Sequence, residues 1–183
     1  MVTQNITLEG VIDASEGWFS VVDDPDIDQS DLAATLREHS EASDAMLFGR
    51  QTFEDMRGYW PKQVDDTTGV TDHLNQVHKY VVSTTMRDPQ WENSTILSGP
   101  LQDEVEALKA RPGKDIITTG SITLVHALID TGLVDEYRLF VYPVALGHGA
   151  RLFRESPKPL RLRLVETRPF RGGVVMLRYR EEK

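Results

Sequence analysis

Between residues 45 and 54 a short apolar run leads through a glycine directly into the start of a helix. Residues 46–48 are Met-Leu-Phe, and a short apolar run of this kind suits a buried strand. Gly49 ends the run, and Thr-Phe-Glu-Asp at 52–55 is typical of a first helical turn. A strand that continues straight into a helix favours an α/β fold, because the helix has to pack back onto the sheet.

The first residue after this glycine is Arg50, so the junction also suggests a possible ligand site. Free backbone N–H groups at a helix start and a neighbouring guanidinium can together bind an anion. By spacing alone this signal is weak, and the alternative, a buried strand that ends in an ordinary turn with a solvated arginine, is favoured from this stretch.

A second junction of the same kind lies further along the chain. Residues 115–119 form an expected buried strand, Gly120 and Ser121 follow it, and apolar residues recur at helical spacing over 122–130. Ser121 suits a helix N-cap. A diphosphate on this helix N-terminus is physically reasonable, and the alternative is a tight turn between two packed elements.

Strands and helices alternate through most of the remaining chain. Further strands are expected at 2–12, 79–84, 95–97 and 137–146, and further helices at 30–43 and 101–110. Pro143 predicts a bulge or a strand end within 137–146. Residues 62–75 read as a long polar connection.

The chain closes with a hairpin, because Arg171-Gly172-Gly173 suits a tight turn between strands at 160–164 and 174–180. This order predicts one α/β domain over residues 1–183. Its central sheet should be mixed but mostly parallel, with helices on both faces and a C-terminal antiparallel hairpin.

Composition excludes several classes of protein. The chain has 39% apolar and 27% charged residues, a net charge of −9 and no cysteine. This balance argues against non-specific binding to nucleic acid, and the missing cysteines exclude disulfides and thiolate metal sites. No apolar run approaches the length of a membrane span, and no export signal is visible at the start. We therefore expect a cytoplasmic protein without nucleic-acid or membrane partners.

Motifs of several enzyme classes are also missing. The sequence has no phosphate-binding Gly-x-x-x-x-Gly-Lys-Ser/Thr loop, no Gly-x-Ser-x-Gly elbow and no His-Glu-x-x-His pattern. Kinase, hydrolase and zinc-enzyme interpretations therefore lose their usual residues, and we expect no metal site.

Four stretches in register resemble the dihydrofolate reductase-like superfamily, and within it the reductase domain of the bifunctional riboflavin-biosynthesis deaminase-reductase. They are Ile6-Thr-Leu-Glu-Gly-Val-Ile12, Phe48-Gly-Arg-Gln-Thr-Phe-Glu54, Ile116-Ile-Thr-Thr-Gly-Ser121 and Tyr142-Pro-Val-Ala-Leu-Gly-His-Gly-Ala-Arg-Leu-Phe153. The resemblance spans nearly the whole chain and implies a three-layer fold that binds NADPH and transfers a hydride to a small heterocyclic substrate.

The resemblance also implies roles for particular residues. The expected cofactor contacts are Gly49, Arg50, Thr52, Ser83, Thr84, Gly120 and Ser121. Among these, Arg50 is expected beside the 2′-phosphate, and Gly120 with Ser121 at the diphosphate. Asp13 and Trp18 are expected near the nicotinamide and the substrate.

Three functions remain open at this point. The first is a reductase similar to 5-amino-6-(5-phosphoribosylamino)uracil reductase of riboflavin biosynthesis, and the second is a dihydrofolate or pterin reductase. In the second, Asp31 in the first long helix would be the proton donor, although Asp31 also suits a helix cap. The third is a non-catalytic, nucleotide-binding dimeric scaffold.

The last hairpin predicts a homodimer. A terminal antiparallel pair tends to lie at the edge of a mixed sheet, and such an edge must be covered or charged. A symmetry mate would cover it, and relatives of the family are commonly homodimers. Val174 and Met176, which alternate with the main apolar face, are the expected contact residues. The alternative is a monomer whose edge is protected by arginines.

Overall fold

The structure is a computed structural model, and it describes residues 1–22, 26–66 and 69–182. The strands are β1 (Val2–Thr7), β2 (Ser43–Gly49), β3 (His78–Val82), β4 (Ser94–Leu97), β5 (Asp115–Ile117), β6 (Glu136–Tyr142), β7 (Leu162–Pro169) and β8 (Val175–Glu181). The α-helices are α1 (Ser30–Glu41), α2 (Arg50–Tyr59), α3 (Val70–Gln76), α4 (Leu101–Lys109) and α5 (Ile122–Asp130), with 3₁₀ turns η1 (Trp18–Val22) and η2 (Trp60–Lys62).

The strands form two four-stranded sheets that meet edge to edge. One has the order β4-β3-β2-β5 and the other the order β1-β6-β8-β7. A parallel bridge between Val2 and Thr118 joins β1 to the end of β5, with the Thr3 N–H donating to the Thr118 carbonyl at 2.9 Å. Among these strands only β8 runs against its neighbours, so the predicted mixed, mostly parallel sheet is confirmed.

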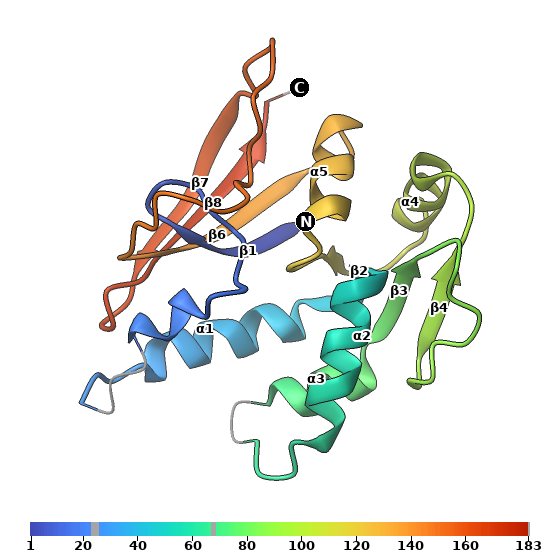
Figure 1. The fold of residues 1–183 in the computed structure, drawn as a ribbon, viewed down its shortest axis with the longest axis horizontal. Helices are drawn as coiled ribbons and strands as arrows, with labels where there is room; N and C mark the ends of the chain where they lie inside the picture. The colour runs from blue at the N-terminus through green and yellow to red at the C-terminus, as the bar shows by residue number, and fades with distance from the viewer. Residues whose placement is uncertain (23–25, 67–68, 183) are drawn as a thin grey trace.

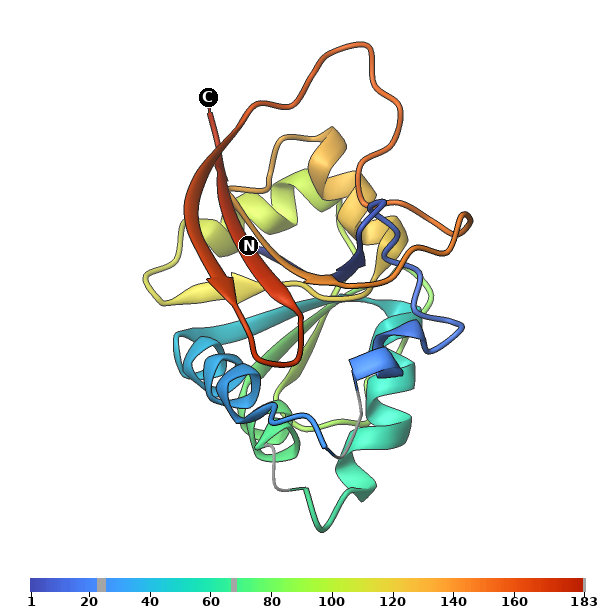
Figure 2. The same ribbon diagram turned by 90° about the vertical axis from the view of Figure 1, so that its left-hand side faces the viewer.

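Helices cover both faces of this sheet, as predicted (Figures 1 and 2). The helices α4 and α5 lie on one face, and α1, α2 and α3 lie on the other (Figure 2). On the first face, Val105 of α4 and Leu124, Val125 and Leu128 of α5 belong to one apolar core cluster with Leu47 of β2. The apolar residues that recur at helical spacing thus form one buried stripe on each of these helices.

The opposite face has two separate core clusters. Phe48 of β2 and Phe53 of α2 pack in one of them, which lies between β2, β3, α2 and α3. The other joins Trp18 and Leu32 to Phe140 of β6 and Val174 beside β8. Among the described residues, no helix combines the length and the apolar character that a membrane span requires.

Two local predictions are confirmed at the end of the chain. Strand β6 ends at Tyr142, directly before Pro143. The turn between β7 and β8 is closed by the Phe170 N–H, which donates to the Val174 carbonyl at 2.8 Å. The prediction of a polar connection over residues 62–75 is corrected, because α3 (Val70–Gln76) begins within it and Leu74 is buried in the core.

The expected dimer contact residues are also corrected. Val174 and Met176 are fully buried, and both pack in the core cluster beneath α1. A side chain that the protomer itself buries has no surface to offer a partner, so any interface must lie elsewhere.

Candidate functional site

The predicted cofactor residues gather at one edge of the sheet. The strands β1 to β6 are parallel, so their carboxyl ends point the same way. Ligands of open α/β sheets bind outside the carboxyl ends of the strands. Gly49 closes β2, Ser83 follows β3, and Gly120 and Ser121 follow β5 at this edge.

The two strand–glycine–helix junctions are bonded to each other. The Gly49 N–H donates to the Ser121 hydroxyl at 3.0 Å, and the Ser121 N–H donates to the Thr52 hydroxyl at 2.9 Å. Three of the predicted cofactor residues thus form one rigid unit. The Ser121 prediction is corrected in one respect: its side chain makes no capping bond to its own helix, because it serves Gly49 instead.

Gly120 and Ser121 have an uncommon backbone conformation. Their φ angles are +57° and +48°, in the left-handed region that favours glycine. A Cβ atom at Gly120 would lie 3.1 Å from Thr52 Cγ2. A larger residue at position 120 would therefore be both strained and crowded, so the close approach of the two junctions depends on this glycine.

Gln4 is a residue that sequence reasoning missed. Its buried amide brackets Gly120: Nε2 donates to the Gly120 carbonyl at 2.8 Å, and Oε1 accepts from the Gly120 N–H at 3.1 Å. No signal in the sequence marks it, because Gln4 is one of four polar residues in the strand Val2–Thr7. Gln4 thus holds both the N–H and the carbonyl of Gly120, in the turn directly before α5.

The N–H groups of Gly120 and Ser121 are therefore already used within the protein. The first internal bond of α5 runs from the Val125 N–H to the Ser121 carbonyl. The N–H groups of residues 122–124 have no partner within the helix, as is usual for a first turn. An anion at this junction would meet these three groups rather than those of the Gly-Ser pair.

Arg50 is the first residue of α2 and stands beside this unit. Its side chain is about half exposed, and Nη1 contacts Glu54 at 3.2 Å one turn along the helix. An exposed pair of this kind contributes little, with a median of about 0–1 kcal/mol. The guanidinium can therefore exchange its carboxylate partner for a phosphate at small cost.

Ser83 and Thr84 lie on the turn after β3. The buried Ser83 hydroxyl accepts from the backbone N–H groups of Met86 at 3.0 Å and Thr85 at 3.3 Å. Thr84 follows Ser83 in the sequence and is exposed. Ser83 thus shapes the turn, and Thr84 is the side chain of this pair that a ligand can reach.

Asp13 and Trp18 are brought together after β1. The Trp18 indole N–H donates to the Asp13 carbonyl at 2.6 Å, and the buried ring packs edge-on against Tyr142 at 5.5 Å. The Asp13 carboxylate accepts from the Ser15 N–H at 3.0 Å, and this bond lowers its pKa. Trp18 thus anchors the loop through its buried ring, whereas Asp13 is the partly exposed polar group of the pair.

The same loop is fastened to the segment that follows β6. Glu9 Oε1 accepts from the N–H groups of Leu146 and Gly147, each at 2.7 Å, and these two bonds lower the pKa of Glu9. His148 Nε2 contacts Glu16 Oε1 at 2.9 Å, which raises the pKa of the histidine. The motif signals at residues 9 and 147–149 were visible in the sequence, but their pairing was not.

Asp31 lies in the first turn of α1, and its two oxygens have different partners. Oδ1 accepts from the Leu32 N–H at 2.8 Å, and Oδ2 accepts from the Arg171 N–H at 3.1 Å. The Arg171 guanidinium is 3.8 Å from Oδ2. Asp31 thus ties α1 to the β7–β8 turn, and Gln29, not Asp31, is the N-cap.

Comparisons with known proteins agree with this geometry. Residues 1–176 match the family model described as the RibD C-terminal domain. Two relatives from Bacillus subtilis (strain 168), the uncharacterized proteins YyaP and YwjB, are 34% and 27% identical over 179 residues. The match covers 95% of this chain in both cases, and 90% and 92% of the relatives.

Solved structures share the fold. A putative riboflavin biosynthesis protein from Shewanella sp. PV-4 matches with a TM-score of 0.74 at 22% identity, covering 100% of this chain and 98% of that one. A pyrimidine reductase-like protein from Corynebacterium diphtheriae matches with a TM-score of 0.65 at 17% identity, covering 100% and 91%.

A bifunctional deaminase/5-amino-6-(5-phosphoribosylamino)uracil reductase from Thermotoga maritima also matches, with a TM-score of 0.65 at 14% identity, covering 99% of this chain and 56% of that one. The sheet order, the two bonded junctions and the match over residues 1–176 lead to one conclusion. This chain has the dihydrofolate reductase-like fold and belongs to the RibD C-terminal domain family.

Proposed function

We propose that this protein is an NADPH-dependent reductase of a small heterocycle, similar to 5-amino-6-(5-phosphoribosylamino)uracil reductase. The observation that carries the proposal is the bonded pair of junctions, Gly49 to Ser121 and Ser121 to Thr52. This unit holds the first turns of α2 and α5 side by side at the carboxyl ends of the strands, which suits a dinucleotide with its several phosphates.

The residues present fit this cofactor. The N–H groups of residues 122–124 would hold the diphosphate, and Gly120 lets the turn before them approach Thr52 closely, because a Cβ atom there would lie 3.1 Å from Thr52 Cγ2. Arg50 would pair with the 2′-phosphate, and Thr84 would lie towards the adenosine end. NADPH supplies a hydride, and the protein supplies binding and orientation.

The substrate would lie at the end of β1 and β6, beside Asp13. Asp13, Glu16 and His148 place titratable side chains on two neighbouring loops there. A polar, partly exposed rim above the buried Trp18 ring suits a flat heterocycle with several hydrogen-bonding groups.

The decisive experiment is a fluorescence titration with NADPH, followed by turnover assays. We expect saturable binding, tighter for NADPH than for NADH, and oxidation of NADPH when the ribosylaminopyrimidine substrate is added. A protein that binds neither nucleotide would be the non-catalytic scaffold instead. Turnover with dihydrofolate but not with the pyrimidine would favour the folate reductase.

The folate alternative is less well supported by the side chains. A proton donor needs a carboxyl that can be protonated and reach the substrate. Both oxygens of Asp31 accept hydrogen bonds from backbone N–H groups, and Arg171 lies beside one of them. Asp31 is therefore engaged in tying α1 to the β7–β8 turn rather than presented to a substrate.

We also propose a homodimer, formed through the outer strand β7. This strand ends the sheet order, and its exposed apolar side chains include Leu164, which is 50% exposed, and Val165, which is 38% exposed. An uncovered apolar sheet edge favours pairing with another chain. Because Val174 and Met176 are buried, β7 replaces them as the expected contact.

A further inference from the structure

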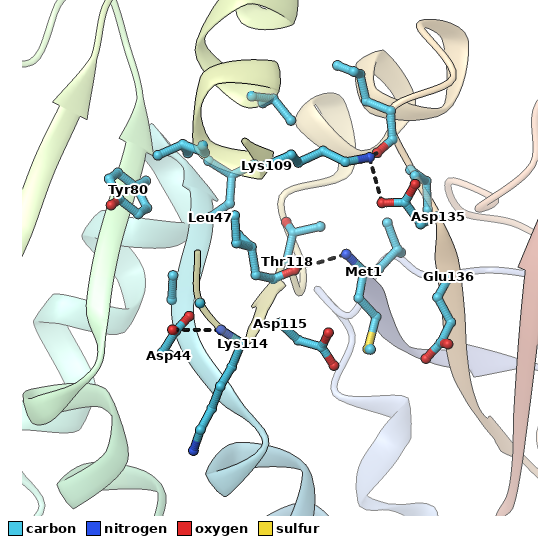
Figure 3. Close-up of a pocket in the computed structure, with 18 of the residues that line it drawn as sticks. Met1, Asp44, Leu47, Tyr80, Lys109, Lys114, Asp115, Thr118, Asp135 and Glu136 are labelled. Atoms are coloured by element: carbon cyan, nitrogen blue, oxygen red, sulfur yellow. Dashed lines mark hydrogen bonds and ion pairs between the residues drawn. The ribbon is translucent and has the colours of Figure 1, made fainter. Parts of the chain in front are cut away.

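A cavity of about 660 Å³ lies at the opposite edge of the sheet, where the strands begin (Figure 3). Its walls come from the starts of β1, β2 and β5 and from the inner sides of α4 and α5. The volume falls within the range of roughly 300–1,000 Å³ that is typical of small-molecule sites. None of the residues predicted to bind the cofactor or the substrate lines it.

Part of the cavity lining is apolar. Leu47 of β2, Val105 and Leu108 of α4 and Leu128 of α5 contribute to it, and all four also belong to the core cluster. The apolar walls would bury the body of a ligand, and burial of apolar surface is the main driving force for such binding.

One polar group in the lining has no hydrogen-bond partner. Thr118 is 3% exposed, and its hydroxyl bonds to nothing among the described residues. Its backbone is fully used, since its N–H donates to the Met1 carbonyl and its carbonyl accepts from Thr3. A buried hydroxyl without a partner costs free energy, which a polar ligand atom would recover.

The two ends of the cavity differ in how their arginines are paired. Near Tyr80, Arg111 makes a single long contact, from Nη1 to the tyrosine hydroxyl at 3.4 Å, and no carboxylate in the described part of the chain pairs with it. The carboxylates of Asp115 and Glu136 lie at the other end, below Met1 in Figure 3, and Glu136 is paired there with Arg178 at 2.6 Å and Arg180 at 2.9 Å. An arginine offers five N–H donors, so most of those of Arg111 remain available.

Lys109 crosses the space between these ends (Figure 3). Its Nζ contacts Asp135 Oδ2 at 2.5 Å and the Leu133 carbonyl at 3.1 Å. The lysine thus links α4 to the segment between α5 and β6, and its aliphatic chain adds apolar surface to the cavity.

We propose that this cavity binds a small amphipathic organic anion, with its apolar body between α4 and α5 and its carboxylate at Arg111. The body lies beneath the Lys109 chain against Leu108, and a polar atom along it bonds to the Thr118 hydroxyl. This site is separate from the cofactor site and does not depend on the proposed reductase function.

Two matched probes test the proposal on the full chain: 4-phenoxybutyrate, whose ether oxygen can accept from the Thr118 hydroxyl, and 4-phenoxybutan-1-ol, which has the same body without the charge. Two-dimensional ¹H–¹⁵N NMR would follow each titration. We expect saturable shifts over residues 105–111 and 116–118 with the carboxylate, and weaker binding of the alcohol. No saturable shifts, or shifts confined to residues 49–52 and 120–124, would overturn the proposal.

Variants then test each contact. Arg111→Gln should weaken binding of the carboxylate probe about tenfold and leave binding of the alcohol probe unchanged, because a charge-assisted hydrogen bond is lost. Lys114→Gln is the matched control, since the Lys114 Nζ bonds to the Glu41 carbonyl at 2.7 Å and points away from the cavity (Figure 3). Equal losses in the two variants, or equal losses for the two probes, would contradict the placement of the anion.

Leu108→Trp should fill the cavity and abolish binding of both probes. If that variant does not fold, Thr118→Val decides the matter, because it removes a hydroxyl that no protein group uses. We expect a native spectrum for Thr118→Val and reduced affinity for both probes. Unchanged affinity in Thr118→Val would show that the base of the cavity does not contact the ligand, and the proposed pose would be wrong.

Discussion

The hydroxyl of Ser121 accepts a hydrogen bond from the backbone N–H of Gly49 at 3.0 Å, across 72 residues of sequence. This bond joins the two places where a strand passes through a glycine into a helix. The return bond, from the Ser121 N–H to Thr52, makes the link reciprocal. The candidate cofactor site is therefore one unit built from two motifs rather than two independent turns.

The first prediction concerns this link. Ser121→Ala should lower the free energy of unfolding by about 1 kcal/mol, because the Gly49 N–H loses its acceptor. Affinity for NADPH should fall as well, since the two helix starts are no longer fixed together. Urea unfolding and fluorescence titration measure the two effects. Ser20→Ala, which removes an exposed hydroxyl bonded to the nearby Gly17 carbonyl, is the control. Wild-type values in Ser121→Ala would contradict the prediction.

The second prediction concerns cofactor choice. Arg50→Ala should weaken binding of NADPH about tenfold or more and leave binding of NADH almost unchanged, because a charge-assisted bond to the 2′-phosphate is lost. The two dissociation constants can be measured side by side. Arg37→Ala, an exposed arginine on α1, should change neither. An unchanged ratio of the two constants in Arg50→Ala would place the 2′-phosphate elsewhere.

The third prediction concerns folate. Dihydrofolate turnover should stay well below ordinary enzyme rates of about 1 s⁻¹. Asp31→Asn should instead lower stability, because the carboxylate holds the Arg171 N–H and ties α1 to the β7–β8 turn. Steady-state kinetics and thermal unfolding of the same two proteins separate these roles. Fast turnover that Asp31→Asn abolishes would support the folate reductase.

The fourth prediction concerns assembly. Light scattering at micromolar concentration should give about twice the 20.7 kDa of one chain. Leu164→Asp on β7 should reduce this mass while the protein stays folded, because Leu164 is exposed in the protomer. Met176→Asp should unfold the protein instead, because it places a charge in the core. A mass near 20.7 kDa for the unmodified chain would argue for the monomer.

The fifth prediction concerns Lys79, which is fully buried on β3. Its Nζ donates to the Leu74 carbonyl at 2.6 Å and the Val77 carbonyl at 2.9 Å. Burial lowers the pKa of Lys79 from 10.5 to about 8. The unfolded chain therefore holds the proton more tightly, so keeping Lys79 charged costs folding free energy below about pH 8.

This cost should disappear as the pH rises from about 8 to 10.5. Over that window the stability of the wild type should rise relative to Lys79→Met, which has no titrating group at this position. Two and a half pKa units correspond to about 3 kcal/mol at most. Denaturant unfolding at several pH values measures the difference. A flat or falling difference would mean that folding does not lower the pKa of Lys79.

The sequence by itself determined the elements and their order. The apolar run at 46–48, the glycines at 49 and 120 and the proline at 143 each act within a few residues, and each marked a strand, a junction or a strand end that the structure contains. The α3 helix was missed because its local sequence is polar and its buried Leu74 is an isolated signal.

Only the tertiary structure decided what the side chains do. Gln4 brackets Gly120 across 116 residues, and Glu9 binds the Leu146 N–H across 137. The Ser121 hydroxyl accepts from the Gly49 N–H instead of capping its own helix. Met176 is buried in the protomer and is not available to a partner. Such contacts depend on strand register and on the packing of distant segments, and no local pattern of residues encodes either of these.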